Sequence, residues 1–418
     1  MKLSEVEDFL GSFVFQEGCH GKEMAGLPSF TRIEKIIIQG EEVPYFINEY
    51  WTSRQRQACS LQEVSYRACF KPQLPRFFIE MFTKKGDLVY DPFMGRGTTV
   101  IEAVLMDRSA LGNDINPLSK ILTEPRINLP QGEEIQERLL EIGFNLGRRA
   151  EFDLSMFYHP DTEAELVSLR HYLEERKRQG REDRVDRWIR MVATNRLTGH
   201  SPGFFSVYTL PPNQAASRER QKKINLKRNQ TPMYKDVKKI ILKKSKSLLK
   251  DITPEIREAV NNRGKEVLLF SQEAGFTRYI EEASVQLTVT SPPFLNIVQY
   301  SEDNWLRCWF NAIEMRKIEK KITMSRTVYR WAEVMQKVFD ELYRITLRGG
   351  WVAFEVGEVN KGKVKLEEYV IPLGRKAGFT CAGVLVNKQE FTKTANIWGI
   401  KNNSIGTNTN RVVLFQKE

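Results

Sequence analysis

The sequence predicts an α/β protein built on one sheet, with a mostly helical and basic insert. Three observations predict this fold. A short apolar strand at residues 87–90 runs into a glycine-rich turn and an apolar helix at 100–106. A second strand, 285–289, alternates apolar and polar residues and ends at two prolines, which cannot continue a sheet ladder. Between these units, residues 125–262 interrupt the strand pattern with helical spacing and clustered positive charge.

The glycine-rich turn follows the first strand directly. Two glycines separated by one residue let the backbone come close to a ligand at the N-terminus of the next helix. An isolated Gly-x-Gly is also found in ordinary tight turns, but a strand before it and a helix after it favour a cofactor cradle. The candidate cofactor residues in this turn are Asp91, Phe93, Gly95, Gly97 and Thr98.

The second strand ends in Ser291-Pro292-Pro293-Phe294. This turn presents a hydroxyl, a carbonyl that two fixed proline φ angles hold rigid, and an aromatic face. Such a set suits a flipped nucleobase, whose ring stacks while its exocyclic amine donates hydrogen bonds. Ser291 Oγ and the Pro292 carbonyl are the expected acceptors, and Phe294 is the expected stacking residue. Taken alone, the tetrapeptide also fits an ordinary turn.

Together these two motifs resemble those of the S-adenosylmethionine-dependent DNA amino-methyltransferases, which methylate cytosine N4 or adenine N6. The resemblance implies a Rossmann-like sheet that ends in an antiparallel hairpin, here strands at 384–386 and 412–415. It also implies S-adenosylmethionine as cofactor and double-stranded DNA as substrate. Ser at position 291 favours cytosine N4; adenine N6 is the second reading, and an RNA guanine-N2 methyltransferase the third. A catalytically silent DNA-binding protein is the alternative from another class.

The same resemblance assigns further cofactor contacts, each with a competing structural reading. Phe70, Lys71 and Pro72 match the segment that closes over the methionine end, or they begin a plain helix. Asp114 with Ile115, after the strand at 109–112, would bind the ribose hydroxyls, or Asp114 or Asn116 would cap a helix. Glu273, after the strand at 267–270, would accept from the adenine amine, or it is a surface capping carboxylate.

Composition is consistent with a nucleic-acid enzyme that works without a metal. Lys and Arg number 64 and Asp and Glu 53, a net charge of +11, and the isoelectric point is near 9.3. The five cysteines form no Cys-x-x-Cys pair, so no zinc site is predicted. None follows a proline, so the chain does not resemble the 5-carbon cytosine methyltransferases, which carry a Pro-Cys nucleophile. Without a long apolar run or a signal pattern, we expect a cytoplasmic, nucleoid-associated prokaryotic protein.

The positive charge is concentrated at residues 218–250. This segment contains thirteen Lys or Arg and two acids, so its local charge is +11. A clustered patch of one sign indicates phosphate contacts, although such runs also form solvated helix faces. Residues 195–208 mix polar and aromatic side chains and read equally as a DNA-contacting loop or as a core strand at 205–210. The candidate DNA contacts are Arg196, His200, Lys222, Lys223, Lys227, Arg228, Lys238, Lys239, Lys243 and Lys244.

We therefore expect four segments. Residues 1–50 form an N-terminal extension, 51–124 and 263–418 form the two parts of the methyltransferase core, and 125–262 form a target-recognition and DNA-binding domain. The insert falls between the second and third strands, whereas common arrangements of the resembled family place target recognition after the third strand or after the core. A separately encoded restriction endonuclease is the expected functional partner.

Overall fold

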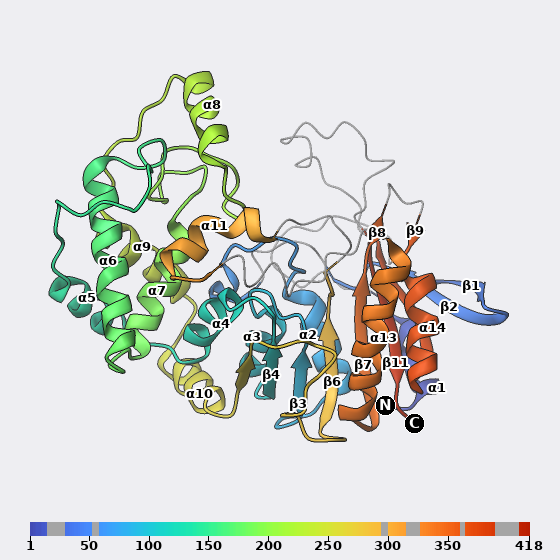
Figure 1. Cartoon of the computed structure of the whole chain (residues 1–418). Helices are drawn as coiled ribbons and strands as arrows, with labels where there is room; N and C mark the ends of the chain where they lie inside the picture. Colours follow the sequence, from blue (N-terminus) through green and yellow to red (C-terminus); the bar gives the residue numbers. More distant parts are fainter. Residues whose placement is uncertain (15–29, 52–57, 294–299, 315–326, 360–363, 389–408) are drawn as a thin grey trace.

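The protein, described here from a computed structural model, is defined over residues 1–14, 30–51, 58–293, 300–314, 327–359, 364–388 and 409–418. One nine-stranded sheet organises these residues (Figure 1). Its strand order is β1-β2-β10-β11-β7-β6-β3-β4-β5. The strands are β1 (Arg32–Ile38), β2 (Glu41–Asn48), β3 (Leu88–Asp91), β4 (Ser109–Asn113), β5 (Leu268–Phe270), β6 (Val285–Thr290), β7 (Thr346–Val356), β10 (Thr380–Lys388) and β11 (Thr409–Gln416), and a separate pair is β8 (Glu358–Val359) with β9 (Val364–Lys365).

The central strands reproduce the predicted fold. Strands β5, β4, β3, β6 and β7 run parallel, whereas β11 pairs antiparallel with both β7 and β10. The strands expected at 87–90, 109–112, 267–270 and 285–289 are β3, β4, β5 and β6, and the expected terminal hairpin is β10 with β11. The prediction of a Rossmann-like α/β sheet with a terminal antiparallel hairpin is confirmed.

The order of the strands reverses between β3 and β6. From β3 the chain moves to β4 and then β5 on one side, and it returns to β6 and β7 on the other side. At such a switch point the connections leave neighbouring strands in opposite directions, and a crevice opens outside their carboxyl ends. Both sequence motifs follow the two strands that flank this crevice.

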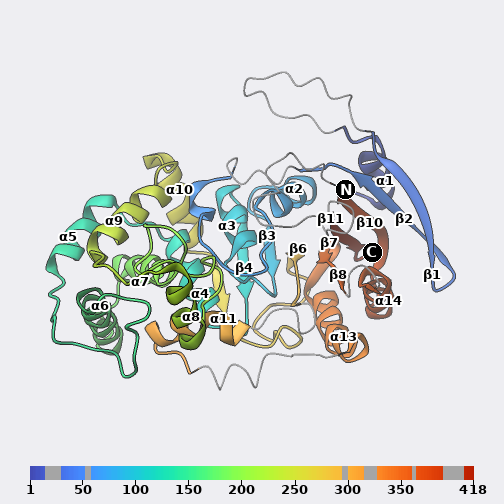
Figure 2. The same ribbon diagram turned by 90° about the horizontal axis from the view of Figure 1, so that it is seen from above.

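Helices cover both faces of the sheet (Figure 2). On one face, α2 and α3 bury Phe78 and Val100 in an apolar core that continues into the insert. On the other face, α13 and α14 bury Phe339 and Ile371 in a second core. Among the described residues outside the insert, the helices are α1 (Leu3–Ser12), α2 (Gln73–Phe82), α3 (Thr98–Leu105), α11 (Tyr300–Phe310), α13 (Val328–Ile345) and α14 (Glu367–Ala377), and η2 (Ser60–Gln62) is a short 3-10 turn. In the described part of the chain, every helix falls short, in length or in apolar character, of what a bilayer-spanning segment requires.

The N-terminal extension widens the sheet. Strand β2 pairs in parallel with β10, and β1 forms the outer edge. Helix α1 buries Val6 and Leu10 in the first apolar core. The described residues of the extension therefore pack on the core.

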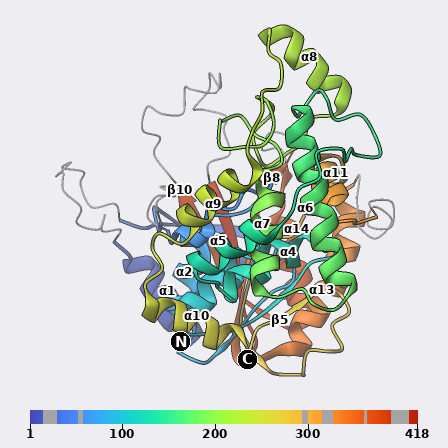
Figure 3. The same cartoon turned by 90° about the vertical axis from the view of Figure 1, so that its left-hand side faces the viewer.

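The insert between β4 and β5 is mostly helical, as predicted. Figures 1 and 3 show its helices gathered beside the sheet, with α8 standing above the others. The expected alternative of a core strand at 205–210 is correct only in part: Phe205 is buried and Tyr208 forms an isolated bridge with Gly199, but the segment forms no strand, and the Val207 N–H donates to the Phe157 carbonyl at 2.9 Å. The helices are α4 (Leu118–Thr123), η3 (Glu124–Ile127), α5 (Gly132–Glu141), α6 (Pro160–Arg178), α7 (Arg184–Arg196), α8 (Arg218–Arg228), α9 (Val237–Leu248) and α10 (Pro254–Gly264).

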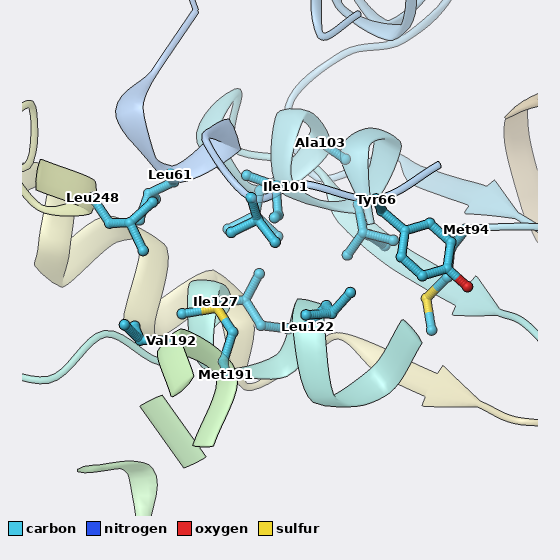
Figure 4. Packing of buried hydrophobic residues seen from close by; sticks show 14 of the residues in the cluster. Leu61, Tyr66, Met94, Ile101, Ala103, Leu122, Ile127, Met191, Val192 and Leu248 are labelled. Carbon is cyan, nitrogen blue, oxygen red and sulfur yellow. The ribbon is translucent and has the colours of Figure 1, made fainter. Parts of the chain in front are cut away.

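The insert shares its apolar core with the sheet. Figure 4 shows Leu61 and Ile101 facing Met191, Val192 and Leu248 of the insert within one cluster of buried side chains. Because no solvent-exposed layer separates the two groups, we infer that the insert and the first half of the sheet unfold together.

A core deletion in α9 tests this inference. Ile241 is fully buried in the shared core, so Ile241→Ala should lower the free energy of unfolding by about 2–5 kcal/mol, through lost contacts and the cavity left behind. Calorimetry should show one transition at a lower temperature. The control is Leu140→Ala in α5, where the side chain is 72% exposed and little should change. Two separate transitions, with only one of them shifted, would contradict a shared core.

Candidate active site

The two sequence motifs meet at the carboxyl ends of β3 and β6. These strands pair in parallel, and the Thr290 hydroxyl donates to Asp91 Oδ1 at 2.7 Å. One residue into α3, the Thr99 hydroxyl donates to the Val289 carbonyl at 3.1 Å. The glycine-rich turn is thus fastened to the Ser-Pro-Pro turn by two side-chain hydrogen bonds.

A cavity of about 400 Å³ opens beside these bonds. This volume lies within the usual range for small-molecule and cofactor sites. Both motifs line it, together with residues that follow β4 and β5 and residues of α13. Its lining includes Tyr66, Arg67, Ala68, Cys69, Phe70, Pro92, Phe93, Met94, Gly95, Thr98, Asp114, Ile115, Asn116, Gln272, Glu273, Ala274, Gly275, Ser291, Pro293, Trp331 and Met335.

Glycine is required at the two positions of the turn for different structural reasons. Gly95 lines the cavity with φ at +51°, a conformation that favours glycine. Gly97 does not line the cavity; its φ is +77°, and an added Cβ would lie 2.3 Å from Thr123 Oγ1. Gly97 therefore allows α3 to pack against α4, and it shapes the cradle without touching its contents.

Asp114 supports the turn from the end of β4. Its Oδ2 accepts from the Gly95 N–H and its Oδ1 from the Asn116 N–H, each at 2.9 Å. Asn116 Oδ1 in turn accepts from the Leu118 N–H at 3.1 Å, so the capping reading of this segment is also satisfied. A carboxylate has about four lone-pair sites, which leaves Asp114 able to accept further hydrogen bonds from a ligand in the cavity.

Asp91 is buried and incompletely paired. Its Oδ1 accepts from Thr290 and from the Phe93 N–H, whereas Oδ2 is buried without a hydrogen-bond partner among the described residues. The neighbouring Thr99 hydroxyl is directed to the Val289 carbonyl. Burial raises the pKa of the Asp91 carboxyl to about 7. Asp91 is not among the residues that line the cavity; it ends β3, directly before the lining residues Pro92 and Phe93.

The segment before α2 contributes more than the sequence indicated. Of the three candidates there, Phe70 lines the cavity, but Lys71 and Pro72 do not. Pro72 instead precedes α2 as its N-cap residue, in agreement with the helix-entry reading. Burial lowers the pKa of Lys71. The residues from Tyr66 to Cys69, which sequence analysis did not single out, form this wall.

The remaining cofactor candidates lie at the carboxyl ends of the strands, next to the cavity. Phe93, Thr98 and Ile115 line the cavity beside the glycine turn and β4. Glu273 lines it beyond β5 and is exposed, so it stands at the opening. The structure thus brings candidates from three separate strands to one cavity.

The Ser-Pro-Pro turn forms the opposite wall. Ser291 and Pro293 line the cavity, and Pro292 is buried behind them. The Pro293 carbonyl accepts from Trp331 Nε1 at 2.9 Å, which ties the turn to α13. Phe294, the expected stacking residue, lies outside the described residues.

Sequence analysis missed one functional candidate, Glu355. This residue lies in β7, the strand next to β6, and its carboxyl is hydrogen-bonded to the side chains of Ser291 and Asn410. Burial raises its pKa to about 7. The signal was present in the sequence, because an acid interrupts the apolar run Trp351–Val356, but a single acid in a strand indicates no particular partner.

The basic candidates do not form one surface. Lys222, Lys223, Lys227 and Arg228 are exposed on α8, and Lys239 and Lys243 are exposed on α9. By contrast, the Lys244 side chain is only 12% exposed and pairs with Glu63, and desolvation lowers its pKa to about 8. This burial corrects the expectation that Lys244 is a surface contact for DNA.

Three further candidates are engaged within the protein to different degrees. Lys238 donates to the Ile142 carbonyl at 2.7 Å and lies over the Phe144 ring. Arg196 lies 4.0 Å from the Phe204 ring centroid, and desolvation lowers its pKa to about 10. Only His200 of this group is exposed. Lys238 and Arg196 therefore support the fold of the insert.

The chain is similar to proteins described as DNA methyltransferases. A family model of N6/N4 methyltransferases, described as DNA methylase, matches residues 31–122. Type II methyltransferase M.BsoBI of Geobacillus stearothermophilus is 23% identical over 309 residues, which cover 65% of this chain and 57% of that protein. Type II methyltransferase M.MjaI of Methanocaldococcus jannaschii is 41% identical over 64 residues, 15% of this chain and 21% of that protein.

The chain thus spans well under two thirds of the length of these relatives. Among solved structures, a protein of Thermus thermophilus, described as a DNA modification methylase complexed with S-adenosyl-L-methionine, is 20% identical. That match covers 35% of this chain and 53% of the other, with a TM-score of 0.23. At this score the likeness adds nothing to what the strand order establishes.

The raised pKa of Asp91 gives a prediction about stability. A pKa of about 7 lies above the value of about 3.9 for Asp in an unfolded chain, so folding takes up a proton between these values. Stability should therefore fall as the pH rises from 5 to 7, by up to about 1.4 kcal/mol per pH unit for this carboxyl. Asp91→Asn should flatten that fall in urea unfolding curves. Equal slopes in the variant and the parent protein would contradict the assignment.

Proposed function

We propose that this chain, which belongs to the S-adenosylmethionine-dependent DNA amino-methyltransferases, transfers a methyl group to the N4 amine of a cytosine flipped out of duplex DNA. The observation that carries the proposal is a single cavity lined by both the glycine turn and the Ser-Pro-Pro turn. The methyl donor and the acceptor base must bind next to each other. In this cavity the glycine turn can contact the donor and the Ser-Pro-Pro turn can contact the base.

The residues present fit S-adenosylmethionine. Asp114 retains acceptor capacity for the ribose hydroxyls, and Glu273 stands at the opening, where it would accept from the adenine amine. Phe70, Phe93 and Ile115 supply apolar contacts. When bound, this cofactor supplies a methyl group on a positively charged sulfur, which is a good leaving group.

The Ser-Pro-Pro turn would prepare the acceptor base. The lone pair of an exocyclic amine is delocalised into the ring, so the amine is a weak nucleophile. Acceptors at both N–H groups draw them out of the ring plane and restore the lone pair, and Ser291 Oγ and the Pro292 carbonyl are the groups assigned to this role. Because the turn is rigid and fastened to β3 and α13, alignment accounts for much of the acceleration.

Glu355 completes the hydrogen bonding of Ser291. A serine hydroxyl that accepts from the amine must direct its own hydrogen elsewhere, and the Glu355 carboxyl is the group bonded to it. As the N–C bond forms, the amine loses a proton; Ser291 Oγ takes it while its own proton passes to Glu355. A pKa of about 7 suits a group that accepts a proton near neutral pH.

The choice of cytosine N4 over adenine N6 rests on Ser291 in place of the Asp found in related motifs. Adenine N6 is the second candidate, because the same two acceptors and the same cavity serve either amine. We further propose that the insert binds the DNA and that a separately encoded restriction endonuclease acts with this enzyme. The names of the relatives, all type II methyltransferases, support that partnership.

The direct test identifies the methylated nucleoside. The full chain is incubated with S-adenosylmethionine and duplex DNA of mixed sequence, the DNA is digested, and the products are identified by mass. We expect N4-methylcytidine in its deoxy form; N6-methyldeoxyadenosine would transfer the proposal to adenine, and no product on DNA would overturn it. Ser291→Ala is the matched control and should lower turnover by about 10²–10³-fold, with cofactor affinity nearly unaltered.

A pH profile tests Glu355. Because the deprotonated carboxyl accepts from Ser291, turnover at saturating cofactor should rise with pH through about 7. In Glu355→Gln this rising limb of the pH profile should disappear. Turnover should also fall about 10²-fold, as expected for the loss of a proton acceptor. Asp91→Asn is the control, because it removes a buried carboxyl of similar pKa that bonds Thr290 and not Ser291. Retention of the limb in Glu355→Gln, or its loss in the control alone, would remove Glu355 from the mechanism.

A further inference from the structure

The positive charge of residues 218–250 is divided between two helices that face different surroundings. Helix α9 buries Val237, Ile241 and Leu248 against α5, α6, α7 and η2. Helix α8 buries a single residue, Gln221. The two helices stand apart in all three ribbon views (Figures 1, 2 and 3). The lysines of α8 and those of α9 are therefore presented on different surfaces of the insert.

Helix α8 is held in place by polar bonds. Gln221 Nε2 and Gln230 Nε2 donate to the Tyr208 carbonyl at 3.0 and 2.9 Å, and Asn225 Nδ2 donates to the Met156 carbonyl at 2.8 Å. The Arg228 guanidinium lies 3.7 Å from the centroid of the Tyr208 ring. The one apolar attachment of α8 among the described contacts is Ile224, which is partly buried against the first core. A short helix with so little apolar burial is marginal in water, so these polar bonds fix its position and leave its other sides to solvent.

The start of α8 is fixed beside the candidate active site. The Ala215 N–H donates to the Asp303 carbonyl, and Trp305 Nε1 donates to the Ala216 carbonyl, each at 3.0 Å, so α11 holds the chain just before α8. Asp303 also pairs with Arg67 at 2.5 Å, and Arg67 lines the cavity. One ion pair therefore links α11, which holds the start of α8, to Arg67 in the cavity wall. Figure 1 shows α8 standing above α11.

From these observations we infer that α8 is the DNA-docking helix of the insert, that it lies against the phosphates of a duplex groove next to the flipped base, and that α9 does not. This inference rests on the proposed function. The exposed cations of α8 greatly outnumber its one acid, Glu219. An eleven-residue helix is about 16 Å long, enough to cross a major groove about 12 Å wide. The exposed cations are Arg218, Arg220, Lys222, Lys223, Lys227 and Arg228.

Two matched triple variants test the assignment. Lys222→Ala, Lys223→Ala and Lys227→Ala remove three exposed charges from α8, and Lys239→Ala, Lys243→Ala and Lys246→Ala remove three exposed charges from α9. Affinity for a fixed duplex is measured over a range of salt concentrations, with circular dichroism and cofactor affinity as controls for folding. We expect the α8 variant to bind at least 10-fold more weakly and its log–log salt slope to fall by up to about 2.7, the value for three lost phosphate contacts. The α9 variant should stay within about threefold.

The outcomes separate this inference from the proposed function. Equal weakening by both variants would mean that only net charge matters and would overturn the role of α8. An unaltered α8 variant, or weakening by the α9 variant alone, would overturn it as well. If the parent protein binds duplex DNA through α8 but methylates no base, the proposed reaction fails while the docking helix stands. If it methylates DNA and the α8 variant is unaffected, only the docking helix fails.

Discussion

The hydrogen bond from Thr290 to Asp91 is the interaction on which the rest of the site depends. It joins the last residues of two neighbouring parallel strands, and the residues that follow each strand carry one of the two motifs. Thr99, the second residue of α3, repeats the connection through its bond to Val289. Because both bonds are buried, their strength is little reduced by competition from water. The crevice between β3 and β6 consequently has a fixed width, and the two walls of the cavity keep their spacing.

Much of the fold could be predicted because local sequence patterns determine it. Apolar strands, the glycine turn, the double proline and the terminal hairpin each leave a signal within about ten residues, and the strands β3, β4, β5 and β6 follow the predicted ranges. The candidate contacts at Gly95, Asp114 and Ser291 come from the same short-range signals. The cavity they line was therefore predictable to the extent that strand ends meet at one edge of a parallel sheet.

The features of the site that could not be predicted from the sequence depend on contacts between residues that are far apart in the chain. Glu355 lies 64 positions after Ser291, and only the pairing of β6 with β7 brings the two together. Lys244 has the same sequence environment as Lys243, yet the helix rotation directs one side chain toward Glu63 and the other to solvent. Gly97 serves packing against Thr123, which no Gly-x-Gly pattern distinguishes from ligand contact. Tertiary geometry decides each of these cases.

The way α8 is anchored has a consequence for the substitutions that this helix can accept. Two of its attachments end on main-chain carbonyls, those of Tyr208 and Met156, which every substitution at those positions preserves. The solvent-facing positions of the helix contribute almost nothing to the apolar core. Substitutions there are free of the folding constraint that governs α9, so the charge on α8 can change in small steps while the sheet and the cavity stay intact.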